Sequence, residues 1–239
     1  MEEVRLITNE NAKSPVSEAY RTIRTNIQFS QAAGKELKTI LMTSPTPNEG
    51  KSTTISNLGV VMAQSGKKVC LVDCDFRNPT QHKIFKLKNV GMSNAIVGKE
   101  LAEVIQKTDI ENLSVIASGP VAPNPSELLG SERMTELLAE LSAQFDYVLV
   151  DTPPVMPVTD AAVMANKVDG VIMLLESGAV APQAAVEAKT RLEQAGAHIL
   201  GVVLNKVDVA AGHYGYGGYG KNGYGYYYYY GNESKKTNE

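Results

Sequence analysis

Short apolar runs recur along the chain and alternate with stretches of helical periodicity. The runs occupy residues 39–42, 69–72, 113–116, 147–150, 171–175 and 199–204. Apolar runs of this length are typical of strands that are buried on both faces of a sheet. We expect helices between them, one beginning at residue 51 and others near 127–143, 160–165 and 183–194. The alternation predicts an α/β fold with a mostly parallel central sheet and helices on both faces.

A further helix is predicted before the first strand. Ser14 can cap its N-terminus, and Pro15 suits the first helical position. Val16, Tyr20 and Ile27 then fall on one face at helical spacing. The pattern places this helix at about residues 14–33.

Length, charge and cysteine content exclude several classes of protein. A chain of 239 residues suffices for one α/β domain with a sizeable core, and a net charge of -3 gives no electrostatic basis for nonspecific nucleic-acid binding. No apolar run approaches the roughly 20 residues of a membrane-spanning helix, and Glu2 and Glu3 do not suit a signal peptide. Cys70 and Cys74 with three scattered histidines form no metal or disulfide pattern. We expect a cytoplasmic protein that does not bind nucleic acid.

The last 27 residues, 213–239, differ in composition from the rest of the chain. Nine of the eleven tyrosines lie there, interleaved with glycine and without aliphatic side chains that could build a core. This composition predicts a disordered tail after a folded domain at 1–212. The tail tyrosines are Tyr214, Tyr216, Tyr219, Tyr224, Tyr226, Tyr227, Tyr228, Tyr229 and Tyr230.

A phosphate-binding loop is predicted between the first strand and the helix that begins at Lys51. The segment 44–53 reads Ser-Pro-Thr-Pro-Asn-Glu-Gly-Lys-Ser-Thr. In this position backbone N–H groups bind phosphate, Lys51 reaches the β- and γ-phosphates, and the Ser52 hydroxyl can bind Mg²⁺. Pro45 replaces the first glycine of the usual motif. The predicted nucleotide-binding residues of the loop are Pro47, Asn48, Glu49, Gly50, Lys51, Ser52 and Thr53.

Three aspartates follow two later strands at the same predicted sheet edge. Asp73 and Asp75 follow the run at 69–72, and Asp151 follows the run at 147–150. A single aspartate at a strand end is often a turn residue or a helix cap, but three beside a phosphate loop favour a Mg²⁺ site with a proton acceptor. We expect a P-loop nucleotide-binding domain that uses Lys51, Asp73, Asp75 and Asp151 in catalysis.

At these motifs the chain resembles the bacterial tyrosine kinases. That family has a modified Walker A loop, a Walker A′ segment of apolar residues followed by Asp-x-Asp-x-Arg, and a Walker B strand ending in Asp-Thr-Pro-Pro, as at 73–77 and 151–154. The resemblance implies ATP and Mg²⁺ as cofactors, with Ser52, Asp73, Asp75 and Asp151 around the metal and Asp73 as the base. Asn48 stands where the family has glycine, and asparagine tolerates positive φ.

The main alternative is the related group of cell-division and plasmid-partition ATPases. Those proteins carry a signature lysine four residues before the glycine of Gly-Lys-Ser/Thr, where this chain has Thr46. In this alternative the chain would use ATP as a dimer switch, and its tyrosine tail would be a self-associating segment.

Asn205 could recognise adenine, although Asn205-Lys-x-Asp208 also resembles a guanine-specific motif. The preference for ATP over GTP as the nucleotide rests on the resemblance alone.

The helix at 14–33 also contains Glu18, Arg21 and Arg24 at three-residue steps. Such a face is commonly an intrahelical salt-bridge surface. The resemblance links this Glu-x-x-Arg-x-x-Arg element to a ring-shaped homo-oligomer. We therefore predict oligomerisation through these three residues.

The tyrosine tail is the predicted phosphoacceptor. Stacking of aromatic rings would also accept phenylalanine, yet all four phenylalanines lie outside the tail. The predicted activity is autophosphorylation of the tail, between subunits. The resemblance further implies control of capsular or exopolysaccharide synthesis, a membrane activator of the polysaccharide co-polymerase type that recruits the protein to the membrane, and a cognate tyrosine phosphatase.

Overall fold

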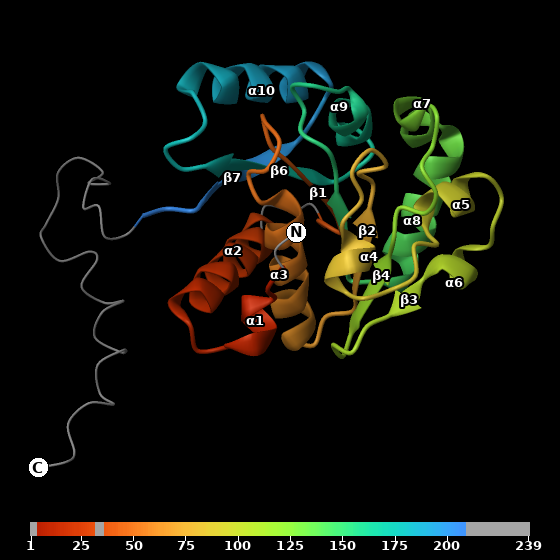
Figure 1. Ribbon diagram of the computed structural model, residues 1–239, viewed down its shortest axis with the longest axis horizontal. Coiled ribbons are helices and arrows are strands. Elements are labelled where there is room, and N and C mark those ends of the chain that lie inside the picture. The colour runs from red at the N-terminus through yellow and green to blue at the C-terminus, as the bar shows by residue number, and fades with distance from the viewer. Residues whose placement is uncertain (1–3, 32–35, 209–239) are drawn as a thin grey trace, which may run out of the picture. The chain divides into compact units, whose positions relative to one another are not determined.

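The computed structural model describes residues 4–31 and 36–208, and these form an α/β domain around one seven-stranded sheet (Figure 1). The sheet order is β3-β4-β2-β5-β1-β6-β7, and every pairing is parallel except β3 with β4. The strands are β1 Thr39–Thr43, β2 Val69–Asp73, β3 Gln106–Lys107, β4 Leu113–Ile116, β5 Tyr147–Asp151, β6 Gly170–Glu176 and β7 Ile199–Asn205. The predicted fold class is confirmed.

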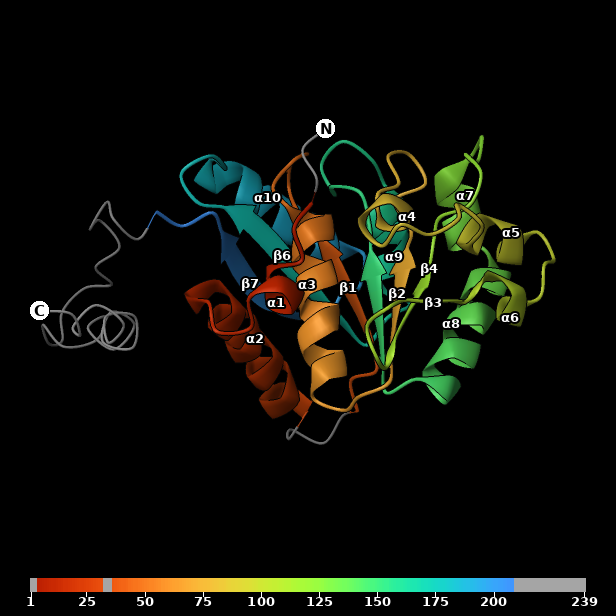
Figure 2. The ribbon, with the colours of Figure 1, turned by 60° about the horizontal axis from the view of Figure 1, so that its bottom comes forward.

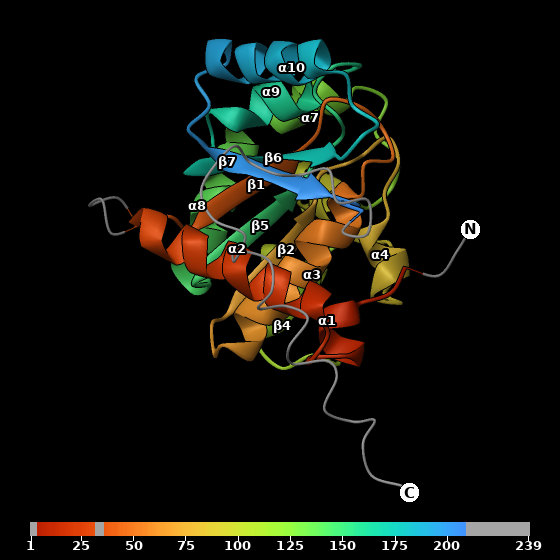
Figure 3. The same ribbon diagram turned by 90° about the vertical axis from the view of Figure 1, so that its left-hand side faces the viewer.

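Helices cover both faces of the sheet. The helices are α1 Ile7–Glu10, α2 Pro15–Gln31, α3 Lys51–Gln64, α4 Gln81–Ile84, α5 Met92–Ile96, α6 Leu101–Val104, α7 Pro125–Gly130, α8 Glu132–Gln144, α9 Asp160–Ala165 and α10 Pro182–Gln194. Figure 2 shows α1, α2 and α3 together in front of the sheet, and Figure 3 shows α9 and α10 on the opposite side. No helix in the described ranges is long and apolar enough to cross a membrane.

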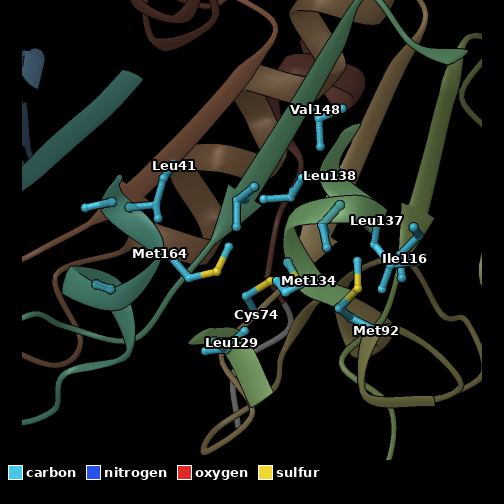
Figure 4. Packing of buried hydrophobic residues seen from close by; sticks show 14 of the residues in the cluster. Leu41, Cys74, Met92, Ile116, Leu129, Met134, Leu137, Leu138, Val148 and Met164 are labelled. Atoms are coloured by element: carbon cyan, nitrogen blue, oxygen red, sulfur yellow. The ribbon is translucent and has the colours of Figure 1, made fainter. Parts of the chain in front are cut away.

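Two hydrophobic cores explain why the strands are apolar at every position. Leu41 and Val148 belong to the core on the α8, α9 and α10 side, whereas their neighbours Ile40 and Leu149 belong to the core under α2 and α3. Successive strand residues point to opposite faces, so a sheet covered twice needs apolar side chains throughout. Figure 4 shows Cys74 in the first of these cores. Burial raises the pKa of the Cys74 thiol well above its usual value, as is typical of an unreactive thiol packed in a core.

The helix predicted at 127–143 is two helices. α7 ends at Gly130, and Ser131 is the N-cap of α8, where its Oγ accepts a hydrogen bond from the Met134 amide over 3.2 Å. The apolar spacing continues across the break, which is why periodicity alone did not reveal it. The short elements α1, α4, α5, α6 and β3 were not predicted either.

The N-terminal helix α2 spans Pro15–Gln31, close to its prediction. The tail at 213–239 and all nine of its tyrosines lie outside the described residues. The predicted domain boundary after residue 212 therefore stays a prediction.

Candidate nucleotide and phosphoryl-transfer site

The phosphate loop joins β1 to α3, so it lies at the carboxyl edge of the sheet and at a helix N-terminus. Gly50 has φ 98° and Asn48 has φ 65°, both in the left-handed region. The prediction that asparagine would accept positive φ at position 48 is confirmed. The loop therefore turns sharply at these two positions.

Glu49 fixes the loop from within. Its side chain is buried, and Oε1 accepts hydrogen bonds from the Thr46 amide over 2.5 Å and the Thr46 hydroxyl over 2.8 Å. The other oxygen, Oε2, accepts from the amide of Glu176 at the end of β6 over 2.9 Å. Glu49 therefore holds the loop to the sheet through its carboxylate, and its predicted part in nucleotide binding stays a prediction.

Asn205, at the end of β7, contacts the same loop. Its Nδ2 donates to the Glu49 carbonyl oxygen over 2.8 Å, and the neighbouring Lys206 Nζ donates to the Asn48 carbonyl oxygen over 3.2 Å. The structure thus places Asn205 against the phosphate loop backbone. Its predicted contact with adenine stays a prediction.

Lys51 is buried at the first position of α3. Burial lowers its pKa, while Asp151, Asp75 and Glu49 act in the opposite direction. A desolvated ammonium among carboxylates is expected of a lysine that binds phosphate.

The three aspartates lie at one edge of the sheet, as predicted. Asp73 and Asp151 are register partners at the ends of the neighbouring strands β2 and β5, and both are fully buried. Asp75 lies two residues beyond β2. Burial raises the pKa of all three carboxyls, that of Asp151 to about 6, and Asp73 is raised further by the nearby Asp151. Such an accumulation of desolvated carboxylates favours the binding of a cation.

The three carboxylates have different hydrogen-bond partners. Asp73 accepts from the amides of Asp75, Thr80 and Gln81 over 3.0–3.1 Å, and so shapes the loop after β2. Asp75 Oδ1 accepts from the Asn78 amide over 2.9 Å. Asp151 Oδ2 accepts from Gln81 Nε2 over 2.7 Å, whereas its buried Oδ1 has no hydrogen-bond partner in the described structure.

The free Oδ1 of Asp151 fits a Mg²⁺ site. Mg²⁺ in phosphate sites takes one or two carboxylates together with hydroxyl, water and phosphate oxygens. Ser52 is close enough to Asp151 to oppose the rise of its pKa. Over residues 4–31 and 36–208, no three acidic, histidine or cysteine side chains form a metal-binding group by themselves. The assignment of Ser52, Asp73, Asp75 and Asp151 as Mg²⁺ ligands stays a prediction.

A cavity of about 770 Å³ opens over the loop and the strand ends. Lys51, Ser52, Asp75 and Arg77 line it, together with Pro47, Asn48, Gly50 and Thr53 of the loop. Asp73 and Asp151 are fully buried and do not line this cavity. The cavity has room for a nucleotide.

Gln81 was missed by the sequence reasoning. Its buried side chain donates to Asp151 Oδ2 over 2.7 Å and to the Ser52 carbonyl oxygen over 3.3 Å, and it accepts from the Ser56 hydroxyl over 2.7 Å. The backbone amide of Gln81 donates to Asp73 Oδ2 over 3.0 Å. Gln81 thus connects the loop helix, β2 and β5. The one available signal was its position shortly after the aspartate motif.

The charged residues of α2 contact their own chain. Arg21 pairs with Glu18 and donates to the Ala12 carbonyl oxygen over 2.7 Å, while Arg24 Nη1 donates to the Val61 carbonyl oxygen of α3 over 3.0 Å. Arg24 is therefore partly a packing residue between α2 and the phosphate-loop helix. Glu18 and Arg21 lie more open to solvent.

The fold and the site are those of P-loop nucleotide-binding proteins, and three aspartates lie at the sheet edge beside the phosphate loop. A family model described as AAA domain matches residues 37–195. The kinase domain of the tyrosine kinase ETK of Escherichia coli superposes with a TM-score of 0.80 at 34% identity, over 91% of this chain and 86% of that one. The septum site-determining protein MinD of Pyrococcus horikoshii, complexed with Mg-ADP, has a TM-score of 0.60 at 22% identity over 70% and 69%, which shows the shared fold alone.

Sequence comparison narrows the class to one family. Tyrosine-protein kinase YwqD of Bacillus subtilis is 42% identical over 217 residues, which cover 90% of this chain and 91% of that protein. The putative tyrosine-protein kinase CapB of Staphylococcus aureus is 40% identical over 230 residues, or 95% and 96%. The chain belongs to the bacterial tyrosine-protein kinases. The predicted family is confirmed, and the cell-division ATPases are related to it by fold.

Proposed function

We propose that this kinase transfers the γ-phosphoryl group of ATP to tyrosines of its own C-terminal tail. The observation that carries the proposal is the meeting of Lys51, Asp75 and the phosphate loop at one cavity, with Asp73 and Asp151 paired at the ends of β2 and β5. In the reaction the tyrosine oxygen bonds to the γ-phosphorus, the bond from that phosphorus to the β,γ-bridging oxygen breaks, and the tyrosine proton passes to a carboxylate.

The residues around the cavity have different proposed roles in binding the phosphates and the metal. The loop amides and Lys51 hold the phosphates, and the ammonium offsets the negative charge that is transferred. Ser52 and Asp151 would hold Mg²⁺, with Asp75 at the cavity side. When bound, Mg²⁺ neutralises charge on the phosphate oxygens.

Asp73 is the proposed base. Burial and the neighbouring Asp151 raise its pKa, which strengthens it as a proton acceptor. Asp73 is fully buried and accepts hydrogen bonds from the loop after β2, so this loop would have to move for Asp73 to reach a tyrosine hydroxyl. Catalytic contacts often tighten only in the substrate complex.

The acceptor assignment rests on composition and chain length. The tail carries nine hydroxyl-bearing rings and no phenylalanine. The chain leaves β7 at Asn205, which contacts the phosphate loop. From residue 210 to residue 230, an extended chain spans at most roughly 66 Å, enough to reach a second subunit.

The proposal includes an assembly and its partners. Glu18 and Arg21 on α2 offer charges to a neighbouring subunit of a ring, with Arg24 at the edge of that surface. A membrane activator of the polysaccharide co-polymerase type would recruit the kinase to the inner face of the membrane, and a tyrosine phosphatase would reset it. Capsular or exopolysaccharide synthesis is the proposed process under control.

Labelling tests the acceptor and the route together. Lys51→Met chains with intact tails are mixed with active chains truncated after residue 208, in Mg²⁺ and γ-labelled ATP, and the label is mapped. We expect phosphotyrosine on the inactive chains at a specific rate that rises with protein concentration. If the inactive chains stay unlabelled, while wild-type full-length protein on its own labels its tail at a rate independent of concentration, the transfer occurs within one chain.

A second candidate function is an ATPase switch, which the fold shared with the septum site-determining protein favours. Release of phosphate without any phosphotyrosine would support it. The same labelled ATP distinguishes the two.

A further inference from the structure

Arg77 closes the Asp-x-Asp-x-Arg segment after β2, and neither the proposed mechanism nor the metal site uses it. Its guanidinium forms a two-pronged ion pair: Nε to Asp160 Oδ2 and Nη2 to Asp160 Oδ1, each 2.9 Å. Asp160 is fully buried at the first position of α9. The Arg77 side chain keeps 42% of its surface exposed and borders the cavity beside Lys51, Ser52 and Asp75.

The pair fixes where the guanidinium points. A parallel fork onto both oxygens of a carboxylate is geometrically demanding and allows little rotation. Asp160 begins α9, and α9 follows the segment after β5, whereas Arg77 lies in the loop after β2. The ion pair therefore ties together the two chain segments that leave Asp73 and Asp151. A buried carboxylate needs such a partner, so the contact is maintained.

The fork leaves part of the guanidinium available. Asp160 engages Nε and Nη2, and within residues 4–31 and 36–208 Nη1 makes no hydrogen bond. Arginine has five N–H donors, so several remain for a ligand. At the same rim, Asp75 presents a negative charge toward any anionic substrate. A cation held beside Asp75 offsets that repulsion.

We propose that Arg77, held by Asp160, contacts the terminal phosphate of the nucleoside triphosphate bound in this cavity. Lys51 and the loop amides hold the nucleotide from the helix side, and Arg77 provides donors from the rim. An arginine supplied from the same chain stabilises the charge on a transferring phosphoryl group in other P-loop proteins. The proposal rests on the proposed phosphoryl transfer and adds no covalent step to it.

The proposal predicts that loss of Arg77 affects the binding of a triphosphate but not that of a diphosphate. If Arg77 contacts only the terminal phosphate, its loss leaves ADP binding intact and weakens binding of a non-hydrolysable ATP analogue. Removing Arg77 alone would strand the buried Asp160 carboxylate and disturb the fold. The double variant Arg77→Gln/Asp160→Asn keeps a neutral hydrogen-bonded pair of similar size and removes both charges.

Affinities for Mg-ADP and for the Mg²⁺ complex of a β,γ-imido ATP analogue are measured by calorimetry on the wild type, this double variant, Arg77→Lys and Arg133→Gln. Arg133 pairs with Glu136 and Glu140 on the surface of α8 and serves as the matched control. We expect the double variant to bind ADP within threefold of wild type and the triphosphate analogue at least tenfold more weakly. The affinity of Arg77→Lys for the analogue should lie between those of wild type and the double variant, because lysine keeps the positive charge but cannot form the two-pronged contact with Asp160.

Equal losses for ADP and the analogue, or no loss for either, would overturn the assignment of Arg77. Wild-type protein that forms no phosphotyrosine would instead refute the proposed function, and the comparison of triphosphate with diphosphate would still test Arg77. The single variant Asp160→Asn is measured in the same way. Wild-type affinity for the analogue in this variant would overturn the role given to Asp160 in holding Arg77, whereas weaker analogue binding with unchanged ADP binding would support it.

Discussion

Asn205 donates a hydrogen bond from Nδ2 to the carbonyl oxygen of Glu49 over 2.8 Å, and so joins the last strand to the phosphate loop 156 residues away in sequence. The contact is close-fitting, since a Cβ added at Gly50 would lie 2.4 Å from the same Nδ2. The shape of the loop thus depends on a residue at the sheet edge.

Asn205→Ala should weaken nucleotide binding by roughly two- to tenfold, the worth of one hydrogen bond. If Asn205 acts by holding the loop, ADP and GDP affinities fall by the same factor. A loss confined to ADP would instead support the predicted reading of adenine. Gly50→Ala should be more severe, because it adds strain at φ 98° to the clash.

Asp151→Asn should stabilise the metal-free protein and remove its response to Mg-ADP. Burial raises the pKa of Asp151 to about 6, above the roughly 3.9 of an unfolded aspartate, so the ionised form costs native stability above pH 6. The cost, on the order of 2–3 kcal/mol at pH 8, disappears as the pH falls toward about 4, where the carboxyl is protonated in both states.

Chemical denaturation of wild type and Asp151→Asn across pH 4 to 8, with and without Mg-ADP, measures both effects. The exposed Glu111→Gln is the control. A variant that is no more stable than wild type at pH 8, or that keeps the full gain from Mg-ADP, would contradict the role given to Asp151.

Asp73→Asn should reduce turnover by at least about a hundredfold, within the range that a general base contributes. Nucleotide affinity should fall less, because Ser52 and Asp151 remain. Asp75→Asn is the matched comparison, since its Oδ1 can still accept from the Asn78 amide. If Asp75→Asn instead abolishes turnover while Asp73→Asn retains it, the base is Asp75. The pH dependence of turnover provides a second measurement.

Arg21→Ala and Arg24→Ala should differ in a way that the sequence did not show. Arg24 donates to the Val61 carbonyl oxygen, so its removal should lower the free energy of unfolding by about 1 kcal/mol besides weakening assembly. Arg21→Ala should weaken assembly with little loss of stability. Light scattering measures the mass of the assembly, and thermal unfolding measures the stability. An unchanged assembly mass for Arg21→Ala would show that Arg21 is not part of the interface.

The fold could be predicted because its strands are buried on both faces and its phosphate loop is a local motif. The three aspartates could be placed together because parallel strands end at one edge. Local patterns carry no information on the contact of Gln81 with Asp151 or of Arg77 with Asp160, which join residues 70 and 83 positions apart. The break at Ser131 was hidden for another reason, since the apolar spacing of α7 and α8 is continuous across it.

The most direct test of the kinase mechanism is transfer of label from γ-labelled ATP by Lys51→Met and wild-type protein, followed by mapping of the labelled residues. The account predicts label on tail tyrosines of the wild type and at least a hundredfold less in Lys51→Met, because no other group replaces the ammonium at the transferring phosphate. Equal labelling of the tail in both proteins would contradict the site.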